Sequence, residues 1–247
     1  MNICLFTPEE ITHPLSKTDE RAKHIKKVLH KAEGDTFDAG IIGGNAGIAT
    51  ITKISDAGDV FFSFEPKSAG KRLYPLTMII GFPRPIQLRR LLRDVAGLGV
   101  QKVILCGTDL TEKSYLDSNV VSDGSAYQML LDGTAQAAST HVPKLEVFAS
   151  LDEVLKIENG RMETENSSKI ALDNRRMSCS LHEFLAHESA HSVVAAIGSE
   201  RGWTDRERDV LEDAGFSLCS MGTRILRTET AATVASSIIL DAMGFLG

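Results

Sequence analysis

The chain has 247 residues, 43% hydrophobic and 24% charged, which is ordinary for a globular protein and long enough for two domains. Its formal net charge of −6 argues against nonspecific nucleic-acid binding over the whole surface. No apolar run approaches the roughly 20 residues that span a bilayer, and the first residues lack the pattern of a secretory signal. We therefore expect a cytoplasmic protein with no membrane partner.

Cysteine and histidine positions argue against a metal site. The four cysteines are scattered without a CxxC pair, which favours reduced thiols over structural zinc. His182, His187 and His191 recur in one short segment, but no cysteine or acidic pattern completes a ligand set. We expect no bound metal.

The first seventy residues have the pattern of a small β-rich unit. Short apolar or alternating runs at residues 3–6, 36–42, 48–54 and 60–65 predict strands, and the apolar spacing through 18–30 predicts one helix. A glycine-rich stretch at 43–47 separates two of the strands. Short strands joined by glycine turns are typical of a small barrel.

Two local clusters of basic residues contrast with the acidic total. Phosphate recognition needs a local basic face and not a basic whole, so either cluster offers a contact to nucleic acid. Runs of charge are more often simply solvated surface, and both interpretations stay open here. The first cluster comprises Arg21, Lys23, His24, Lys26, Lys27, His30 and Lys31, and the second comprises Arg84, Arg89, Arg90 and Arg93.

The pattern of predicted elements changes after residues 66–75, a segment that contains two prolines. Alternating strands and helices then indicate a mostly parallel α/β sheet, with a polar loop at 158–168. We therefore expect two domains, at residues 1–70 and 74–247. Strands are predicted at 76–82, 103–106, 145–148, 170–172, 192–197 and 216–221, and helices at 86–97, 126–138 and 151–157.

Two of these predicted strands stop at a glycine, and their ends are candidates for one binding pocket. The run 192–197 leads to Gly198, and the run 216–221 leads to Gly222. Without a Cβ, glycine lets backbone amides and carbonyls come close to a ligand. The second turn leads to Thr228 and an apolar stretch that predicts a helix start, although a plain strand-to-helix connection has a similar pattern.

The two turns resemble the C-terminal signature of the RsmE family, the ribosomal RNA uridine-N3 methyltransferases of the SPOUT class. The chain departs from that pattern at Ser199, Arg201, Trp203 and Met221. An unbroken eight-residue match, 224–231, at the right distance from a glycine-rich partner is nevertheless a specific signal. The other matching residues are Ile197, Gly198, Glu200, Gly202, Glu207, Gly215 and Phe216.

The resemblance implies an α/β protein with two parts. An N-terminal PUA-like RNA-binding β-barrel precedes a SPOUT-type α/β domain with a C-terminal trefoil knot. The resemblance also implies a cytoplasmic homodimer that uses S-adenosyl-L-methionine to methylate N3 of a uridine in 16S ribosomal RNA of the small ribosomal subunit. The knot rests on resemblance alone, because knots are essentially absent from proteins at large and spacing reveals none.

The resemblance also implies roles for residues near the two glycine turns. Arg227 is the first candidate to stabilise negative charge on the uridine, with Glu229 beside it. The structural alternative is an ion pair between Arg227 and Glu229 that fixes the loop, and Thr228 has the alternative role of a helix cap. The residues expected to bind the cofactor are Ile197, Gly198, Glu200, Gly202, Ser220, Met221, Gly222, Ile225, Leu226 and Thr228.

Part of the first basic cluster matches an RNA-contacting segment of the family. His24 and the run 27–29 follow the family pattern His-x-x-x-Val-Leu-Arg, but His30 stands where the family has arginine. The resemblance therefore implies RNA contacts by Arg21, His24, Lys27, His30 and Lys31.

The middle of the chain departs most from the family and leaves alternatives open. Thr108, Asp109 and Leu110 replace the family's Ser-Glu-Arg, and a Glu-Gln-x-x-Arg segment keeps only Gln136. The alternatives are a SPOUT methyltransferase for a different RNA, or a noncatalytic RNA-binding protein. The unbroken block 224–231 argues against the second, because a dead site has no chemical reason to keep it. A dinucleotide-binding enzyme is disfavoured, since no G-x-G-x-x-G follows the strand at 76–82.

Overall fold

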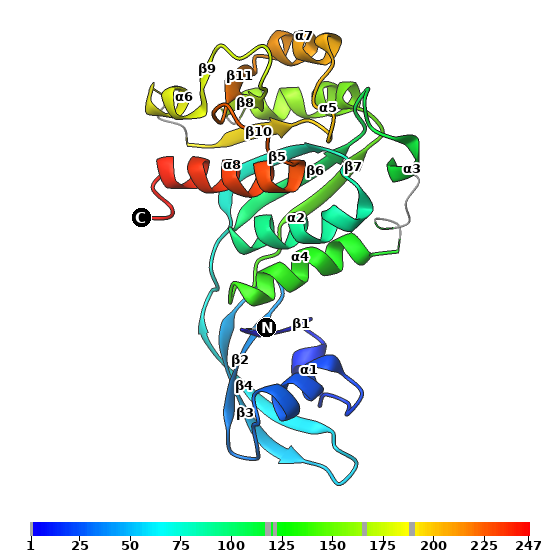
Figure 1. Ribbon diagram of the computed structural model, residues 1–247. Helices are drawn as coiled ribbons and strands as arrows, with labels where there is room; N and C mark the ends of the chain where they lie inside the picture. Colours follow the sequence, from blue (N-terminus) through cyan, green and yellow to red (C-terminus); the bar gives the residue numbers. More distant parts are fainter. Residues whose placement is uncertain (1, 117–119, 121–122, 165–166, 188–190) are drawn as a thin grey trace. The chain divides into compact units, whose positions relative to one another are not determined.

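The computed structural model describes residues 2–116, 120, 123–164, 167–187 and 191–247, which form two compact units (Figure 1). One unit comprises Met1–Arg72 together with Leu131–Val142. The other comprises Leu73–Leu130 together with Pro143–Gly247. The segment Leu131–Val142 thus belongs with the β-rich first unit, although it lies inside the α/β region of the sequence.

The first unit is built on a four-stranded sheet whose strands follow chain order. β1 is parallel to β2, and β2, β3 and β4 are antiparallel neighbours. Phe6, Phe37 and Val60 from these strands enclose a core with Ile25, and the rings of Phe6 and Phe62 lie 5.1 Å apart. The strands are β1 (Cys4–Phe6), β2 (Thr36–Ile41), β3 (Ala46–Ile54) and β4 (Val60–Ser68).

The helix predicted over 18–30 is shorter and irregular. The Asp19 side chain accepts a hydrogen bond from the Arg21 N–H and so caps α1 (Glu20–Lys23). A π-helical turn, η2 (His24–Val28), follows directly, and Leu29 N–H donates to the His24 carbonyl five residues back, at 3.0 Å. His30 then has a φ of 51°, in the left-handed region, where the helix cannot continue. A short 3-10 turn, η1 (Glu10–Thr12), precedes them.

The second unit is built on a seven-stranded sheet in which every neighbouring pair is parallel. The strand order is β7-β6-β5-β10-β8-β11-β9, so β10 lies between β5 and β8 although it follows both in sequence. The carboxyl ends of β10, β8 and β11 consequently meet at one edge of the sheet. The strands are β5 (Tyr74–Gly81), β6 (Val100–Cys106), β7 (Lys144–Phe148), β8 (Ser168–Leu172), β9 (Cys179–Ser180), β10 (Val193–Ile197) and β11 (Ser217–Ser220).

Helices cover both faces of this sheet (Figure 1). Ile79, Ile104 and Val194 pack against Val154 of α5 and Leu211 of α7. The alternate strand residues point to the other face, where α2 and α8 pack together and α8 contacts β5 and β10. The helices of the unit are α2 (Pro85–Gly97), α3 (Lys113–Leu116), α5 (Leu151–Thr164), α6 (Leu181–His187), α7 (Asp205–Asp213) and α8 (Thr228–Ala242). α4 (Ser125–Gln136) begins in this unit and ends in the segment that belongs with the first unit.

One predicted loop is wrong, and several short elements were missed. The polar stretch predicted as a loop at 158–168 belongs mostly to α5, which runs to Thr164, because glutamate and arginine are good helix formers although they are polar. β9, α3, α6 and α7 were not predicted. Among the described residues, no helix is both long and apolar enough to cross a membrane.

Candidate functional site

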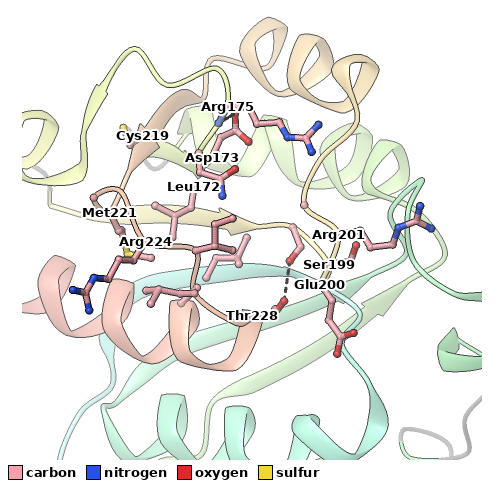
Figure 2. Close-up of a pocket in the computed structure, with 18 of the residues that line it drawn as sticks. Leu172, Asp173, Arg175, Ser199, Glu200, Arg201, Cys219, Met221, Arg224 and Thr228 are labelled. Atoms are coloured by element: carbon pink, nitrogen blue, oxygen red, sulfur yellow. Dashed lines mark hydrogen bonds between the residues drawn. The ribbon is translucent and has the colours of Figure 1, made fainter.

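A pocket of about 310 Å³ opens at the edge where β8, β10 and β11 end (Figure 2). This volume is at the lower end of the range of small-molecule sites. Ligands of open α/β sheets generally bind outside the carboxyl ends of the strands, which is where this pocket lies. Its walls are Leu172–Arg175 after β8, Ile197–Gly202 after β10, Cys219, Met221, Gly222 and Arg224–Leu226 around the end of β11, Thr228 and Ala231 of α8, and Arg208 of α7.

Most residues predicted to bind a cofactor line this pocket. Ser220 is the exception, since it ends β11 and is not one of the lining residues. The role of the other predicted residues in binding the cofactor stays a prediction, but the structure brings these residues together at one site. The predicted residues that line it are Ile197, Gly198, Glu200, Gly202, Met221, Gly222, Ile225, Leu226 and Thr228.

The two glycines that the sequence singled out have different structural reasons. A Cβ at Gly198 would lie 2.8 Å from the carbonyl carbon of Gly202, so only glycine fits where the turn closes on itself. Gly202 N–H donates to the Ser199 carbonyl at 2.8 Å across that turn. Gly222 has open space around it but a φ of 96°, which other residues rarely adopt. Both turns therefore expose backbone to the pocket.

Thr228 links the second turn to the first. Its buried hydroxyl donates to the Gly198 carbonyl at 3.4 Å (Figure 2). The residue that caps α8 is Arg227, in extended backbone, and its side chain makes no capping hydrogen bond. Thr228 thus ties the start of α8 to the glycine turn and does not act as the helix cap.

The two predicted catalytic residues lie beside the pocket and not in its wall. The Arg227 side chain is exposed, between Leu226 and Thr228, which both line the pocket. Glu229 is buried in the first turn of α8. Both residues are described, and the structure contains no ion pair between them, so the pairing considered from the sequence is not formed. The catalytic roles stay predictions.

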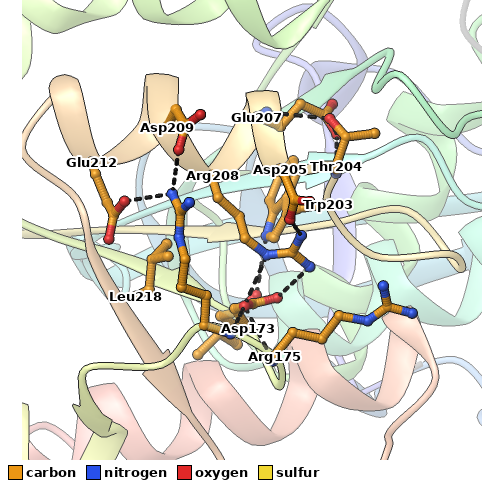
Figure 3. Close-up of polar contacts among 12 residues, drawn as sticks. Asp173, Arg175, Trp203, Thr204, Asp205, Glu207, Arg208, Asp209, Glu212 and Leu218 are labelled. Carbon is orange, nitrogen blue, oxygen red and sulfur yellow. Dashed lines mark hydrogen bonds and ion pairs between the residues drawn. The ribbon is translucent and has the colours of Figure 1, made fainter.

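A buried ion pair at the pocket wall was missed by sequence reasoning (Figure 3). Arg208 of α7 donates from Nε and Nη2 to the two carboxylate oxygens of Asp173, at 3.0 and 3.1 Å. Each side chain is only 3% exposed. Asp173 Oδ2 also accepts the backbone N–H groups of Arg175 and Arg176, at 3.2 and 2.6 Å. The pair therefore fixes the turn that carries Asn174 and Arg175 into the pocket wall.

Both members of the pair are charged at neutral pH. Burial alone would raise the pKa of Asp173, but hydrogen bonds from Arg208 and the Arg176 backbone outweigh it and hold the pKa below 3.8. The hydrogen bond to Asp173 in turn raises the pKa of Arg208. The signal that could have found Asp173 is its position directly after a strand, at the same sheet edge as the glycines.

A second ion pair lies at the pocket's Glu200. Arg84, at the start of α2, donates from Nε to the Tyr115 hydroxyl at 3.0 Å, and the same nitrogen lies 3.0 Å from Glu200 Oε2 in an ion pair. The hydrogen bond to Tyr115 and the charge of Glu200 raise the pKa of Arg84. Arg84, from the second basic cluster, is therefore paired with Glu200 of the loop after β10. This ion pair links the start of α2 to the pocket.

Comparison with known proteins places the chain in a family. The family model of the RNA methyltransferase domain matches residues 71–240. Ribosomal RNA small subunit methyltransferase E of Treponema pallidum is 40% identical over 243 residues, which cover 97% of this chain and 91% of that protein. Ribosomal RNA small subunit methyltransferase E 1 of Borreliella burgdorferi is 34% identical and covers 97% of each chain. The chain belongs to the ribosomal RNA small subunit methyltransferase E family. The RsmE relationship predicted from the sequence is confirmed.

A solved structure of the same family has this fold. The crystal structure of ribosomal RNA small subunit methyltransferase E from Neisseria gonorrhoeae, bound to S-adenosyl methionine, superimposes with a TM-score of 0.78 at 19% identity. The match covers 98% of this chain and 97% of that one. The predicted α/β class, with a small β-rich first unit before a parallel sheet, is confirmed.

The segment that departs from the family pattern has a structural role in this member. Asp109 accepts hydrogen bonds from Arg206 at 2.7 and 3.0 Å, and its N–H donates to Glu207 Oε1 at 2.8 Å. Glu207 also completes a capping box with Thr204 at the start of α7. Asp109 therefore holds the loop after β6 against α7.

In the first unit, some of the residues predicted to contact RNA are exposed and others are engaged in contacts within the protein or buried. The Arg21 guanidinium is bound by Glu10 and Asp19, donates to the Leu5 carbonyl at 2.7 Å, and lies over the Phe6 ring. His24 Nε2 is buried without a hydrogen-bond partner. Lys27 and His30 are exposed, and Lys31 is half-buried. Arg21 is thus committed to holding the unit together.

The histidines and cysteines give no metal site in the described part of the chain. Among the described residues, no three His, Cys, Asp or Glu side chains are grouped to hold a metal ion. All four cysteines are free thiols.

Proposed function

We propose that this protein is an S-adenosylmethionine-dependent methyltransferase of small-subunit ribosomal RNA that methylates N3 of a uridine. The family relationship to two ribosomal RNA small subunit methyltransferases E supports the reaction class and the substrate. The uridine N3 position is inferred from the resemblance in the block 224–231. The observation that carries the proposal is the pocket formed by the two glycine turns at the carboxyl edge of the sheet.

The residues of the pocket suit S-adenosylmethionine. Without a Cβ, Gly198 lets the first turn close against Gly202 at the pocket, and Gly222 leaves open space beside the backbone of the second turn. Leu172, Ile197 and Leu226 supply apolar walls for a flat ring. The hydroxyl of Ser199, a residue of the pocket wall, is buried without a hydrogen-bond partner, so it is available to form a hydrogen bond with a bound ligand or water.

The chemistry requires alignment and charge stabilisation from the protein. Bound S-adenosylmethionine supplies an electrophilic methyl group on its sulfonium, so no metal and no covalent enzyme intermediate are required. Uridine N3 must lose its proton, which leaves negative charge on the ring and its two carbonyl oxygens. We assign the stabilising guanidinium to Arg227, because it is exposed and stands between two pocket residues. Glu229 is buried, so we assign it a supporting role at the start of α8.

The first unit is the proposed RNA-binding domain, as the resemblance to a PUA-like barrel implies. Lys27 and His30 are its exposed candidates for phosphate contact, because both project from the irregular helix end. A cytoplasmic homodimer and a trefoil knot at the end of the second unit also belong to the proposal on the basis of family resemblance.

Calorimetry and nucleoside analysis test this function together. Purified protein should bind S-adenosylmethionine, and Gly222→Val should abolish binding because a β-branched side chain is strongly strained at a φ of 96°. The protein should transfer a labelled methyl group to small-subunit RNA, and mass spectrometry of digested RNA should identify 3-methyluridine.

Each alternative corresponds to a distinct result. Cofactor binding with methylation of another RNA would favour the different substrate. RNA binding without any heat or melting shift from S-adenosylmethionine would refute the methyltransferase proposal in favour of a noncatalytic RNA-binding protein.

A further inference from the structure

Two cysteines meet at the wall of the pocket. Cys179 of β9 and Cys219 of β11 are register partners in neighbouring parallel strands, and their sulfur atoms lie 3.6 Å apart. Cys219 is buried and lines the pocket, and Cys179 is half-buried. The other two cysteines, Cys4 and Cys106, are buried in β1 and β6. All four are described, and these are the two whose sulfurs are in contact.

The backbone geometry is compatible with a bond between these sulfurs. Neighbouring strands lie about 4.8 Å apart, and disulfides form across Cα separations of about 4.4–6.8 Å. The sulfurs must approach from 3.6 Å to about 2.0 Å, a movement within reach of side-chain rotation. β9 has only two residues and is the edge strand of the sheet, so it has few neighbours to oppose a small shift.

Cys219 is coupled to the pocket through its backbone as well as its side chain. Its carbonyl accepts the N–H of Asp173 at 2.9 Å, and Asp173 anchors the turn that carries Asn174 and Arg175. Met221 and Gly222 follow two and three residues later and also line the pocket. A shift of Cys219 toward β9 therefore also shifts the loops after β8 and β11, which form part of the pocket wall.

We propose that Cys179 and Cys219 are a reversible redox pair whose disulfide weakens binding in the neighbouring pocket. The effect on S-adenosylmethionine rests on the proposed function, but formation of the bond does not. The oxidant class is a hydroperoxide, and hydrogen peroxide is the probe. The reduced dithiol is the binding-competent form.

The chemistry proceeds in two balanced steps. The Cys179 thiolate, on the more accessible sulfur, attacks one peroxide oxygen, the O–O bond breaks, and hydroxide leaves a sulfenic acid on Cys179. The Cys219 sulfur then attacks the Cys179 sulfur, the S–O bond breaks, and the Cys219 proton leaves with the hydroxyl group as water. Two thiols lose two electrons, and one hydrogen peroxide becomes two waters. Burial raises the pKa of the Cys219 thiol to about 12, so Cys219 is better suited to resolve the sulfenic acid than to attack the peroxide.

Peptide mapping tests the bond directly. The full-length protein is treated with hydrogen peroxide, alkylated without reductant and digested with trypsin. We expect one species that links residues 177–201 to residues 209–224, and its loss after dithiothreitol. Four alkylated cysteines after peroxide, or Cys179 oxidised to sulfinic acid without a link, would overturn the proposal.

Calorimetry tests the consequence. S-adenosylmethionine should bind the oxidised protein about tenfold more weakly than the reduced protein, a difference of about 1.4 kcal/mol, and dithiothreitol should restore the affinity. Cys179→Ser should bind equally before and after peroxide, and Cys4→Ser, which keeps the pair, should behave as the unmodified chain. A linked protein with unchanged affinity would overturn the control of the pocket. A reduced protein that binds no S-adenosylmethionine would instead refute the proposed function, while the peptide map still decides the disulfide.

Discussion

Arg208 and Asp173 form a buried ion pair that joins α7 to the loop after β8. Two hydrogen bonds, of 3.0 and 3.1 Å, make the pair bidentate, and the Asp173 carboxylate also receives two backbone N–H groups. The remaining Arg208 nitrogen donates to Asp205 at 2.8 Å, at the protein surface. The pair thus fixes a wall of the pocket with two charges that are almost inaccessible to water. Replacing only one of the two residues by a neutral residue leaves the other charge buried without a partner.

Removing one partner should cost much more than removing both. Arg208→Met leaves the Asp173 carboxylate buried without its cation, so we expect a loss of about 3–5 kcal/mol in the free energy of unfolding. Asp205→Asn removes only the surface contact of the same guanidinium and should cost less than about 1 kcal/mol. The double change Asp173→Leu with Arg208→Met should recover much of the single loss. Urea unfolding measures all three, and equal losses for Arg208→Met and Asp205→Asn would contradict the prediction.

The same pair predicts a dependence of stability on pH. Because the folded pKa of Asp173 lies below its usual 3.8, its ionised form stabilises the fold above about pH 4, and this contribution is lost as the pH falls through the folded pKa. Asp173→Asn should therefore be less stable than the unmodified chain at pH 7, and the gap should narrow toward pH 3. Urea midpoints across this range measure the gap, and a gap that stays constant would show that the carboxylate charge does not matter.

Two glycine substitutions separate steric closure from backbone strain. Gly198→Ala puts a Cβ at 2.8 Å from the Gly202 carbonyl carbon, so the turn must open and S-adenosylmethionine affinity should fall about tenfold or more. Gly244→Ala is the contrasting variant, because its φ of 78° brings backbone strain without a steric clash, in open space beyond α8. It should cost about 1 kcal/mol of stability without affecting the cofactor. Equal cofactor affinity in the two variants would argue against the tight turn as part of the binding site.

Sequence reasoning located the pocket because its features are local. A glycine after an apolar run indicates that a side chain does not fit or that the backbone conformation is unusual at that position. Gly198 is an example of the first case and Gly222 of the second. The alternation of strands and helices likewise predicted the parallel sheet, since each buried strand carries its own apolar run.

Features that depend on distant partners could not be predicted in this way. Asp173 and Arg208 are 35 residues apart, and the strand order brings their elements together, because β8 lies between β10 and β11, the two strands that α7 connects. Arg21 was grouped with the exposed cations because the sequence does not show that Glu10 and Asp19 surround it. The end of α5 was predicted too early, because polar residues are compatible with both a loop and a helix.

Arg227 provides a kinetic test of the proposed catalytic assignment. Its side chain is exposed and lies outside the pocket wall, so Arg227→Ala should leave the S-adenosylmethionine dissociation constant unchanged. The catalytic rate should fall about 100- to 1,000-fold, as when one charge-stabilising donor is removed from other enzymes. Arg224→Ala is the matched control, because that exposed arginine lines the pocket and should affect binding more than rate. Single-turnover methylation with saturating cofactor separates the two, and an unchanged rate for Arg227→Ala would exclude it from the chemistry.

Charge reversal in the first unit distinguishes an RNA contact from a structural arginine. Lys27 is exposed, so Lys27→Glu should weaken RNA binding while the unfolding midpoint stays the same. The slope of log affinity against log salt should fall by about 0.7–0.9 for the lost phosphate contact. Arg21→Ala should do the reverse and lower stability, because it leaves Glu10 and Asp19 facing each other without their shared cation. Filter binding at several salt concentrations, beside thermal melts of both variants, measures this, and an unchanged salt slope for Lys27→Glu would remove that residue from the RNA surface.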